Sequence, residues 1–130
     1  MADAAPSDGR PRAGDPILVV RQPWIDWLLD GTKTMELRGT ACRKPVGTRV
    51  YLSRSGTGCV HGSVTFRGYV GPLTRHELEA LVPEHRVVDA ETITYARTYG
   101  WIFDEASALD APIPYAVSRG SVVWRFFSPA

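Results

Sequence analysis

The residues best suited to chemistry lie together in one octet, residues 31–38, which has the pattern GxKxxExR. Lys33 supplies a point charge for a phosphate, and Arg38 supplies a planar fork that matches a phosphate or the edge of a base. Glu36 can hold Arg38 in place or accept hydrogen bonds from a ligand. Gly31 permits a sharp turn and lets a ligand approach the backbone. The octet therefore predicts a polar binding cleft.

The same side chains also allow a structural interpretation, in which Glu36 and Arg38 form an ion pair and Lys33 is solvated. Regular strand alternation would place Lys33 on the same face as Met35, away from Glu36. Lys33 stands at the beginning of the predicted strand, however, where the alternation need not yet apply. Both interpretations stay open on the residues alone.

The segments next to the octet must position it. An apolar run at residues 17–20 predicts a buried strand. Pro23 suits the first turn of a helix over residues 23–30, whose apolar side chains recur at helical spacing and which Gly31 ends. Residues 34–38 alternate between polar and apolar, so they predict a strand with Met35 and Leu37 facing a core.

The remainder of the chain reads as short strands with few helices. Further strands are predicted at residues 48–53, 60–70, 100–104 and 121–127, with bulges at Gly62 and Gly68. Thr74 and Glu77 form a capping-box pattern that begins a helix over residues 74–81, and Pro83 ends it. Residues 90–99 predict a short helix or an irregular segment, and the prolines in residues 106–115 predict a rigid extended segment.

This order of elements indicates an α+β fold, because helices and strands do not alternate as they do in a doubly wound parallel sheet. We predict a small closed or nearly closed β-barrel of about five or six strands with two or three short helices, since closure removes exposed strand edges. The 130 residues fit one domain. Residues 1–16 are rich in Ala, Pro, Asp, Gly and Arg and predict a disordered tail, which leaves residues 17–127 as the domain.

Charge is distributed unevenly along the chain, although its net value is only +1. Residues 38–76 hold seven basic residues and no acidic residue, between two segments with an excess of acids. Such a distribution predicts a local anion-binding surface. Solvated outer faces of strands would give the same pattern, so charge alone does not decide between them.

Several function classes find no support in the sequence. No window approaches the about 18 consecutive apolar residues of a membrane span, and residues 1–16 lack the apolar core of a signal peptide, so we expect a cytoplasmic or nuclear location. Cys42 and Cys59 form no CxxC pair and lack histidines at metal spacing, so free thiols and no metal site are expected. We predict no cofactor, since the chain contains no HExxH, GxSxG or Walker pattern.

An ordered set of motifs extends from residue 17 to residue 127. It comprises the first apolar strand, Gln22-Pro23-Trp24, the GxKxxExR octet, the strand that ends at Ser53, Gly62, Trp101, Pro112-Ile113-Pro114, and Gly120 before Trp124. In this order the chain resembles the ASCH family, within the PUA-like superfamily of RNA-associated β-barrels. The resemblance implies a cleft between the first helix and the barrel that binds RNA or a single nucleotide, in RNA metabolism or modified-nucleoside handling.

We expect the ligand to contact residues in and around this cleft. Tyr51 is included because its strand parity opposes that of Val50 and Leu52, although core packing is the alternative reading for the aromatic side chains. The predicted ligand contacts are Gln22, Trp24, Gly31, Lys33, Arg38, Tyr51 and Arg54.

The resemblance also allows a small hydrolase. Some ASCH proteins are amidohydrolases acting on acetylated cytidine, in which the motif lysine works with a threonine three residues later; others are ribonucleases. The lysine matches Lys33, but the threonine position is Glu36 here, so that mechanism does not carry over intact. Thr34 is the neighbouring hydroxyl, and His61 is a conceivable base for RNA cleavage. The catalytic candidates are thus Lys33, Glu36 and Thr34.

A third reading is a protein-interaction module, as when an ASCH domain forms part of a transcription coactivator. An acidic last third of the chain, beginning at Glu77, could face a protein partner, or it could simply be solvated. Salt-sensitive RNA binding without turnover would favour a binding module. Product formation that depends on Lys33 would favour a hydrolase.

Overall fold

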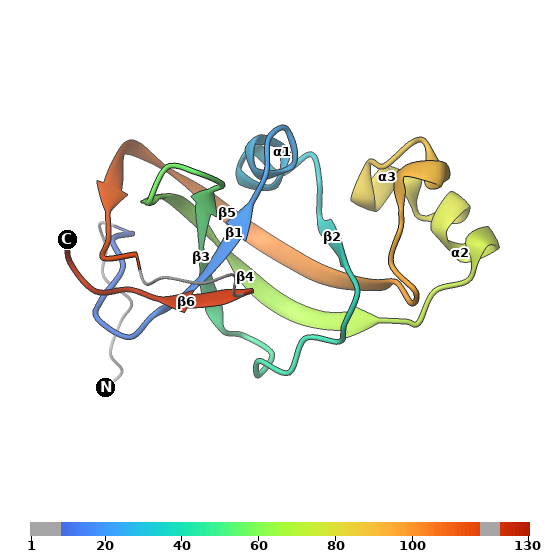
Figure 1. Cartoon of the computed structure of the whole chain (residues 1–130), viewed down its shortest axis with the longest axis horizontal. Coiled ribbons are helices and arrows are strands. Elements are labelled where there is room, and N and C mark those ends of the chain that lie inside the picture. Colours follow the sequence, from blue (N-terminus) through green and yellow to red (C-terminus); the bar gives the residue numbers. More distant parts are fainter. Residues whose placement is uncertain (1–8, 118–122) are drawn as a thin grey trace.

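The computed structural model describes residues 9–117 and 123–130, and six strands of this part form one curled sheet (Figure 1). The strand order is β2-β5-β4-β3-β1-β6. The strands are β1 (Pro16–Val20), β2 (Met35–Arg38), β3 (Arg49–Arg54), β4 (Cys59–Val70), β5 (Tyr99–Pro114) and β6 (Trp124–Phe126). The helices are α1 (Trp24–Asp30), α2 (Arg75–Ala80), α3 (Val82–His85) and the 3-10 helix η1 (Ala90–Thr92).

The long antiparallel pair of β4 and β5 forms the centre of the sheet, and it bends because its register shifts three times. Two shifts lie at Gly62 and Gly68, so both glycines occupy bulges as predicted. The edges are short: β2 pairs with Tyr99–Ile102 of β5, and β6 pairs with Pro16–Leu18 of β1. The described strands therefore make a half-barrel, which stays open between β2 and the β1–β6 edge.

Side chains are buried on both faces of the central strands. One core cluster lies under α1 and contains Leu18, Val20, Ile25, Leu28, Val50, Leu52, Phe66, Trp101 and Phe103. The opposite face of the sheet carries a second cluster made of Ile17, Tyr51, Val60, Ile113, Tyr115 and Phe127. Two-sided burial explains why β1 reads as a continuous apolar run and not as an alternating strand.

Helices α2 and α3 and the segment after them pack against one face of β2. Met35 and Leu37 form a third cluster with Leu78, and Leu73, Leu81, Val87 and Ile93 surround it. Figure 1 shows these helices at the end of the molecule away from β6 and the C-terminus. One face of β2 is thereby committed to packing, so its other face, with Glu36 and Arg38, is left for the opening of the half-barrel.

The chain between residues 74 and 114 departs in detail from the sequence-based prediction. The capping box at Thr74 is present, but Pro83 does not end α2: the helix ends at Leu81, and Pro83 stands in the first turn of α3. The predicted strand at 100–104 and the extended segment after it form the single strand β5, with Glu105 at φ 50° inside it. Pro112 and Pro114 are tolerated because β2 pairs only with the beginning of β5, so the other side of this end lacks a strand partner in the described sheet.

The predicted tail is shorter than residues 1–16. Pro16 belongs to β1, the Gly14 amide donates to the Phe127 carbonyl at 2.8 Å, and the Phe127 amide donates to the Asp15 carbonyl at 2.8 Å. These bonds attach residues 14–16 to the end of the chain, so the folded unit begins before residue 17. Residues 1–8 of the predicted tail and residues 121–122 of the last predicted strand lie outside the described residues.

Candidate functional site

A cleft of about 650 Å³ occupies the opening of the half-barrel, between β1 and β2. Its polar lining comes from four separate segments and consists of Arg21, Lys33, Glu36, Arg38, Ser55 and Thr92. Trp24 and Tyr95 provide aromatic surface, and Val19, Leu37, Val87 and Val123 provide apolar surface. The octet predicted from sequence thus contributes four of the lining residues, all from positions 33–38.

Lys33 is buried at the base of this cleft, with 2% of its surface exposed. Its Nζ donates to the carbonyl oxygens of Met35 and His85, both at 2.6 Å, and lies 3.4 Å from Oε1 of Glu36. The ring centroid of Trp24 lies 5.1 Å from the same nitrogen. Lys33 precedes the first residue of β2, so strand alternation does not apply to it, and it lies on the side of Glu36.

Glu36 bridges the two cations of the octet. Its Oε1 faces Lys33, whereas its Oε2 accepts from Nε of Arg38 at 3.0 Å and lies 2.9 Å from Nη2 of Arg38. The same Nη2 donates to the carbonyl oxygen of Val19 at 3.0 Å, which links β2 to β1 across the opening. The guanidinium carbon of Arg38 lies 5.8 Å from the centroid of the Trp101 ring. Both carboxylate oxygens of Glu36 are therefore engaged by cations.

The contacts of Lys33 decide what its amine can do. Burial lowers the pKa of Lys33, while the neighbouring carboxylate of Glu36 opposes this shift. Three acceptors surround Nζ, and only the ammonium form carries three N–H donors to satisfy them. In this arrangement Lys33 acts as a positive charge beneath the cleft, with two of its N–H donors bound by backbone carbonyls and its charge facing Glu36.

Tyr95 forms an aromatic wall of the cleft that the octet alone does not predict. It is 47% exposed, and its ring lies directly over Gly39: a Cβ added there would be 2.8 Å from Cδ1 of Tyr95 and 3.3 Å from Cγ. A side chain at position 39 would therefore displace the ring. Tyr95 comes from the segment between η1 and β5, far from the octet in sequence.

Several predicted ligand contacts lie elsewhere. Tyr51 does not line the cleft: it is 5% exposed in the second core cluster, because both faces of β3 are buried. Arg54 pairs with Asp26 at 3.0 Å, and the Gln22 amide also donates to Asp26, at 3.2 Å. Neither residue is among those that line the cleft.

Two other predicted residues act through their backbone conformation or their backbone hydrogen bonds. Gly31 ends α1 in the left-handed conformation, with φ 86°, as its position predicted. Thr34 is exposed and does not line the cleft; its amide donates to the Glu84 carbonyl at 3.0 Å. Of the three catalytic candidates, the structure brings Lys33 and Glu36 together and leaves Thr34 apart.

His61 also lies outside the cleft lining. Its Nδ1 accepts from the Arg54 amide at 3.2 Å, and burial lowers its pKa. An accepting Nδ1 fixes the neutral ring with its proton on Nε2. The structure thus gives His61 a backbone partner within the β3–β4 turn and does not place it beside the octet.

Arg21 and Ser55 line the cleft although sequence reasoning did not select them. Arg21 had one usable signal, because it follows the buried strand by one residue and is two residues after Val19, on the same side of the chain. Ser55 and Tyr95 had none, since their approach to the octet depends on strand pairing and on the course of the chain around η1.

Within residues 9–117 and 123–130, no group of three His, Cys, Asp or Glu side chains is placed to hold a metal ion. Cys42 and Cys59 are free thiols, as predicted, and burial raises the pKa of Cys42. None of the helices in the described part is both long and apolar enough to cross a membrane.

Comparison with known proteins supports the fold through structure and not through sequence. No protein-family model matches the chain, and no curated protein sequence matches it. Three crystal structures of ASCH protein from Zymomonas mobilis are similar to it, two of them of point mutants. One mutant aligns with a TM-score of 0.68 at 12% identity over 92% of each chain.

The two other structures align less extensively. The second mutant gives a TM-score of 0.62 at 14% identity, over 78% of this chain and 76% of that one. The third structure gives 0.63 at 11% identity, over 78% and 73%. This chain has a curled six-stranded sheet with three short α-helices, which agrees with the small α+β barrel expected from the motifs. The chain therefore has the fold of an ASCH domain.

Proposed function

We propose that this cleft binds RNA or a nucleotide-like ligand. The observation that carries the proposal is the charge of the lining: among its described residues, Arg21, Lys33 and Arg38 stand with one carboxylate, that of Glu36. Since Lys33 and Arg38 already engage both oxygens of Glu36, the positive charge of the cleft exceeds its negative charge. A concave surface of one sign attracts an anionic ligand.

The aromatic residues of the lining favour an anion that carries a planar ring, such as a nucleotide, over a simple inorganic anion. Trp24 and Tyr95 stand in the same cleft as the arginines, and aromatic rings beside cations are the usual arrangement for nucleobases with their phosphates. Tyr95 is held over Gly39 and yet is 47% exposed, so it offers ring surface at low cost in side-chain entropy. A simple inorganic anion would make no use of these rings.

Binding is favoured over turnover by the state of the catalytic candidates. Lys33 donates to two backbone carbonyls and its ammonium faces Glu36, and Thr34 does not line the cleft. A hydrolytic mechanism would require Lys33 to leave the carbonyl oxygens that bury it. Hydrolysis of acetylated cytidine or of RNA is therefore the alternative that the experiment must separate from binding.

The test is a titration followed by the fluorescence of the tryptophans, because Trp24 lines the cleft. Free nucleosides, acetylated cytidine, nucleoside monophosphates and short single-stranded RNAs are added at low salt. A quench that saturates, and that weakens for the charged ligands as salt is raised, is the expected result. Each mixture is then separated by chromatography to detect conversion.

Two tyrosines of equal exposure provide a matched pair of variants. Tyr95 lines the cleft and is 47% exposed, whereas Tyr69 lies at the end of β4, outside the lining, and is 45% exposed. Tyr95→Ala should weaken binding by about 5- to 100-fold, the range that corresponds to loss of one base–aromatic stack. Tyr69→Ala should leave the affinity unchanged.

The other outcomes each point to a different function. Product that is formed by the wild type and lost in Lys33→Ala would establish a hydrolase. Equal effects of Tyr95→Ala and Tyr69→Ala would place the ligand outside the cleft. If none of the ligands bound, the proposal would be wrong, and a protein partner would be sought by pull-down.

A further inference from the structure

Lys33 and Arg38 are the basic residues of the octet, but their geometry leaves little for a phosphate. The Lys33 ammonium donates to two backbone carbonyls and faces Glu36. Nε of Arg38 donates to Glu36, while its Nη2 contacts both Glu36 and the Val19 carbonyl. These two residues set the charge and shape of the cleft, so the main anion contact must be sought among the remaining lining residues.

Arg21 is the remaining cation of the lining. Its side chain is exposed, and it has no ion-pair or hydrogen-bond partner among the described residues. Arg54, the last residue of β3, is a second arginine near this part of the cleft, but it forms an ion pair with Asp26 at 3.0 Å. A free guanidinium in a cleft offers the bidentate donor pair that a phosphate accepts.

Ser55 is a backbone neighbour of Arg21. Val20 is in register with Arg54 in the β1–β3 pair, and the Ser55 amide donates to the Val20 carbonyl at 2.9 Å. Arg21 directly follows β1 and Ser55 directly follows β3, so the two residues are neighbours where both strands end. Both line the cleft, so adjacent positions of its lining supply a guanidinium and a hydroxyl group.

We propose that this corner, made by Arg21 and Ser55, holds the phosphate of the ligand, and that the base lies toward Trp24 and Tyr95. This inference rests on the proposed function and specifies the ligand class: a nucleotide, free or within a chain, and not a neutral nucleoside. Arg38 lines the same cleft and is bound to Glu36 and to the Val19 carbonyl. The phosphate contributes its charge at the Arg21 end, and the base contributes its ring at the Tyr95 end.

The test compares the four common ribonucleosides with their 5′-monophosphates at constant ionic strength. Charge-assisted hydrogen bonds from Arg21 should make the wild type bind a monophosphate about 10-fold or more tightly than its nucleoside. Arg21→Gln should remove most of that difference and leave the nucleoside affinity unchanged. Ser55→Ala should reduce the difference by about 2- to 5-fold, as expected for one hydrogen bond.

Arg43→Gln is the matched control, because Arg43 is an exposed arginine that does not line the cleft. It should preserve the preference for monophosphates. With a short RNA as the probe, Arg21→Gln should lower the slope of log affinity against log salt by about 0.7, the value for one phosphate contact on a single strand.

The experiment distinguishes a wrong assignment of the phosphate to Arg21 and Ser55 from a complete absence of ligand binding in the cleft. If nucleosides and monophosphates bind equally, or if Arg21→Gln behaves like Arg43→Gln, the phosphate assignment is overturned while binding in the cleft stands. If neither nucleosides, monophosphates nor RNA bind, both the proposed function and this inference are wrong. Inorganic phosphate alone should compete weakly with the monophosphate and not with the nucleoside.

Discussion

The Nζ atom of Lys33 donates a 2.6 Å hydrogen bond to the carbonyl oxygen of His85. This bond joins a residue two positions before β2 to the last residue of α3, 52 positions later in the chain. Around it the Thr34 amide donates to the Glu84 carbonyl at 3.0 Å, and the Arg86 side chain donates to the Thr32 carbonyl at 2.8 Å. The octet therefore anchors the helical segment α2–α3 as well as lining the cleft.

Replacing Lys33 by methionine should destabilise the fold strongly. The substitution keeps an unbranched stem but removes the ammonium group, which leaves Glu36 and the carbonyls of Met35 and His85 without their shared donor. Breaking a buried ion pair on one side typically costs about 3–5 kcal/mol. We expect a loss of this size in the free energy of unfolding, measured by urea denaturation.

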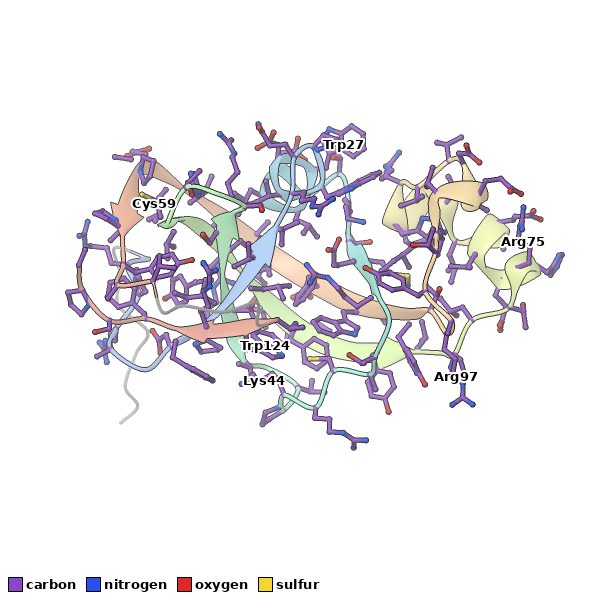
Figure 2. The ribbon with its side chains drawn as sticks, in the orientation of Figure 1. Trp27, Lys44, Cys59, Arg75, Arg97 and Trp124 are labelled. Carbon is purple, nitrogen blue, oxygen red and sulfur yellow. The ribbon has the colours of Figure 1, made fainter. Side chains whose placement is uncertain are left out.

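Lys44→Met is the control for that experiment. Lys44 is the chain's other lysine, and its Nζ lies 4.8 Å from the Trp124 ring and 5.0 Å from the Phe126 ring. Figure 2 shows Lys44 beside Trp124 at the β6 side of the sheet. Losing an exposed cation–π contact costs about 1 kcal/mol or less. Equal losses in the two variants would show that the buried contacts of Lys33 contribute nothing special.

His85 should make stability depend on pH. The buried ring accepts from the Val87 amide at Nδ1, 2.9 Å away, so its proton is on Nε2, which donates to the Leu78 carbonyl at 2.7 Å. Burial lowers the pKa of His85 from the ordinary 6.5. The unfolded chain therefore takes up a proton before the folded chain does, so stability is greatest above the ordinary value and declines as pH falls below it.

The measurement is the melting temperature from about pH 8 down to about pH 5.5, a range that spans the ordinary pKa of histidine. His85→Gln removes the titrating group, so its melting temperature should fall less over this range than that of the wild type. His76→Gln, at an exposed position of α2, should fall as the wild type does. A wild-type slope in His85→Gln would contradict this prediction.

Gly62 is required by the close approach of β5 and α1. A Cβ at this position would collide with the backbone oxygen of Ser107 and would lie 2.6 Å from Cδ2 of Leu29. A backbone atom cannot move without disturbing the β4–β5 pairing, so Gly62→Ala should cost about 3 kcal/mol or more, as overpacking does at its upper end. Chemical denaturation measures this loss.

Gly100→Ala makes the informative comparison. There the added methyl would meet the sulfur and Cγ of Met35, which belong to a flexible side chain. The loss should be smaller than at Gly62, near about 1 kcal/mol. If Gly100→Ala were the more damaging change, the bulge at Gly62 would have to open more easily than its contacts indicate.

The capping box of α2 should contribute a modest and separable stabilisation. The Thr74 hydroxyl accepts from the Glu77 amide at 3.1 Å, and the Glu77 carboxylate accepts from the Thr74 amide at 2.8 Å. Thr74→Ala should lower the free energy of unfolding by about 1 kcal/mol, whereas Thr74→Ser keeps the hydroxyl and should lose little. Thermal unfolding of the two variants distinguishes loss of the cap from loss of the methyl group.

Local sequence patterns predicted the elements whose geometry depends on near neighbours. Gly31 ends α1, Thr74 and Glu77 cap α2, and Gly62 and Gly68 mark bulges in β4. These outcomes depend on backbone conformations and hydrogen bonds within a few residues. The position of Pro83 was misread for a related reason: proline ends a helix or begins one, and only the turn at Leu81 decides which.

The faces of the strands were less predictable. Tyr51 opposes Val50 and Leu52 in strand parity, which suggested a surface position, but the structure buries both faces of β3. Whether the second face of a strand is covered depends on distant segments, here Ile113, Tyr115 and Phe127. The sequence of β3 itself contains no pattern that predicts the burial of its second face.

The sequence by itself predicted that Lys33, Glu36 and Arg38 lie in one polar cleft and that the chain forms a small α+β barrel of five or six strands, with motifs that resemble the ASCH family. Only the tertiary structure decided that Lys33 is buried on the His85 carbonyl, and that Arg21, Ser55 and Tyr95 complete the cleft. The physical reason is that backbone carbonyls and strand neighbours act as partners without any side-chain signature. Their positions depend on how the whole chain packs.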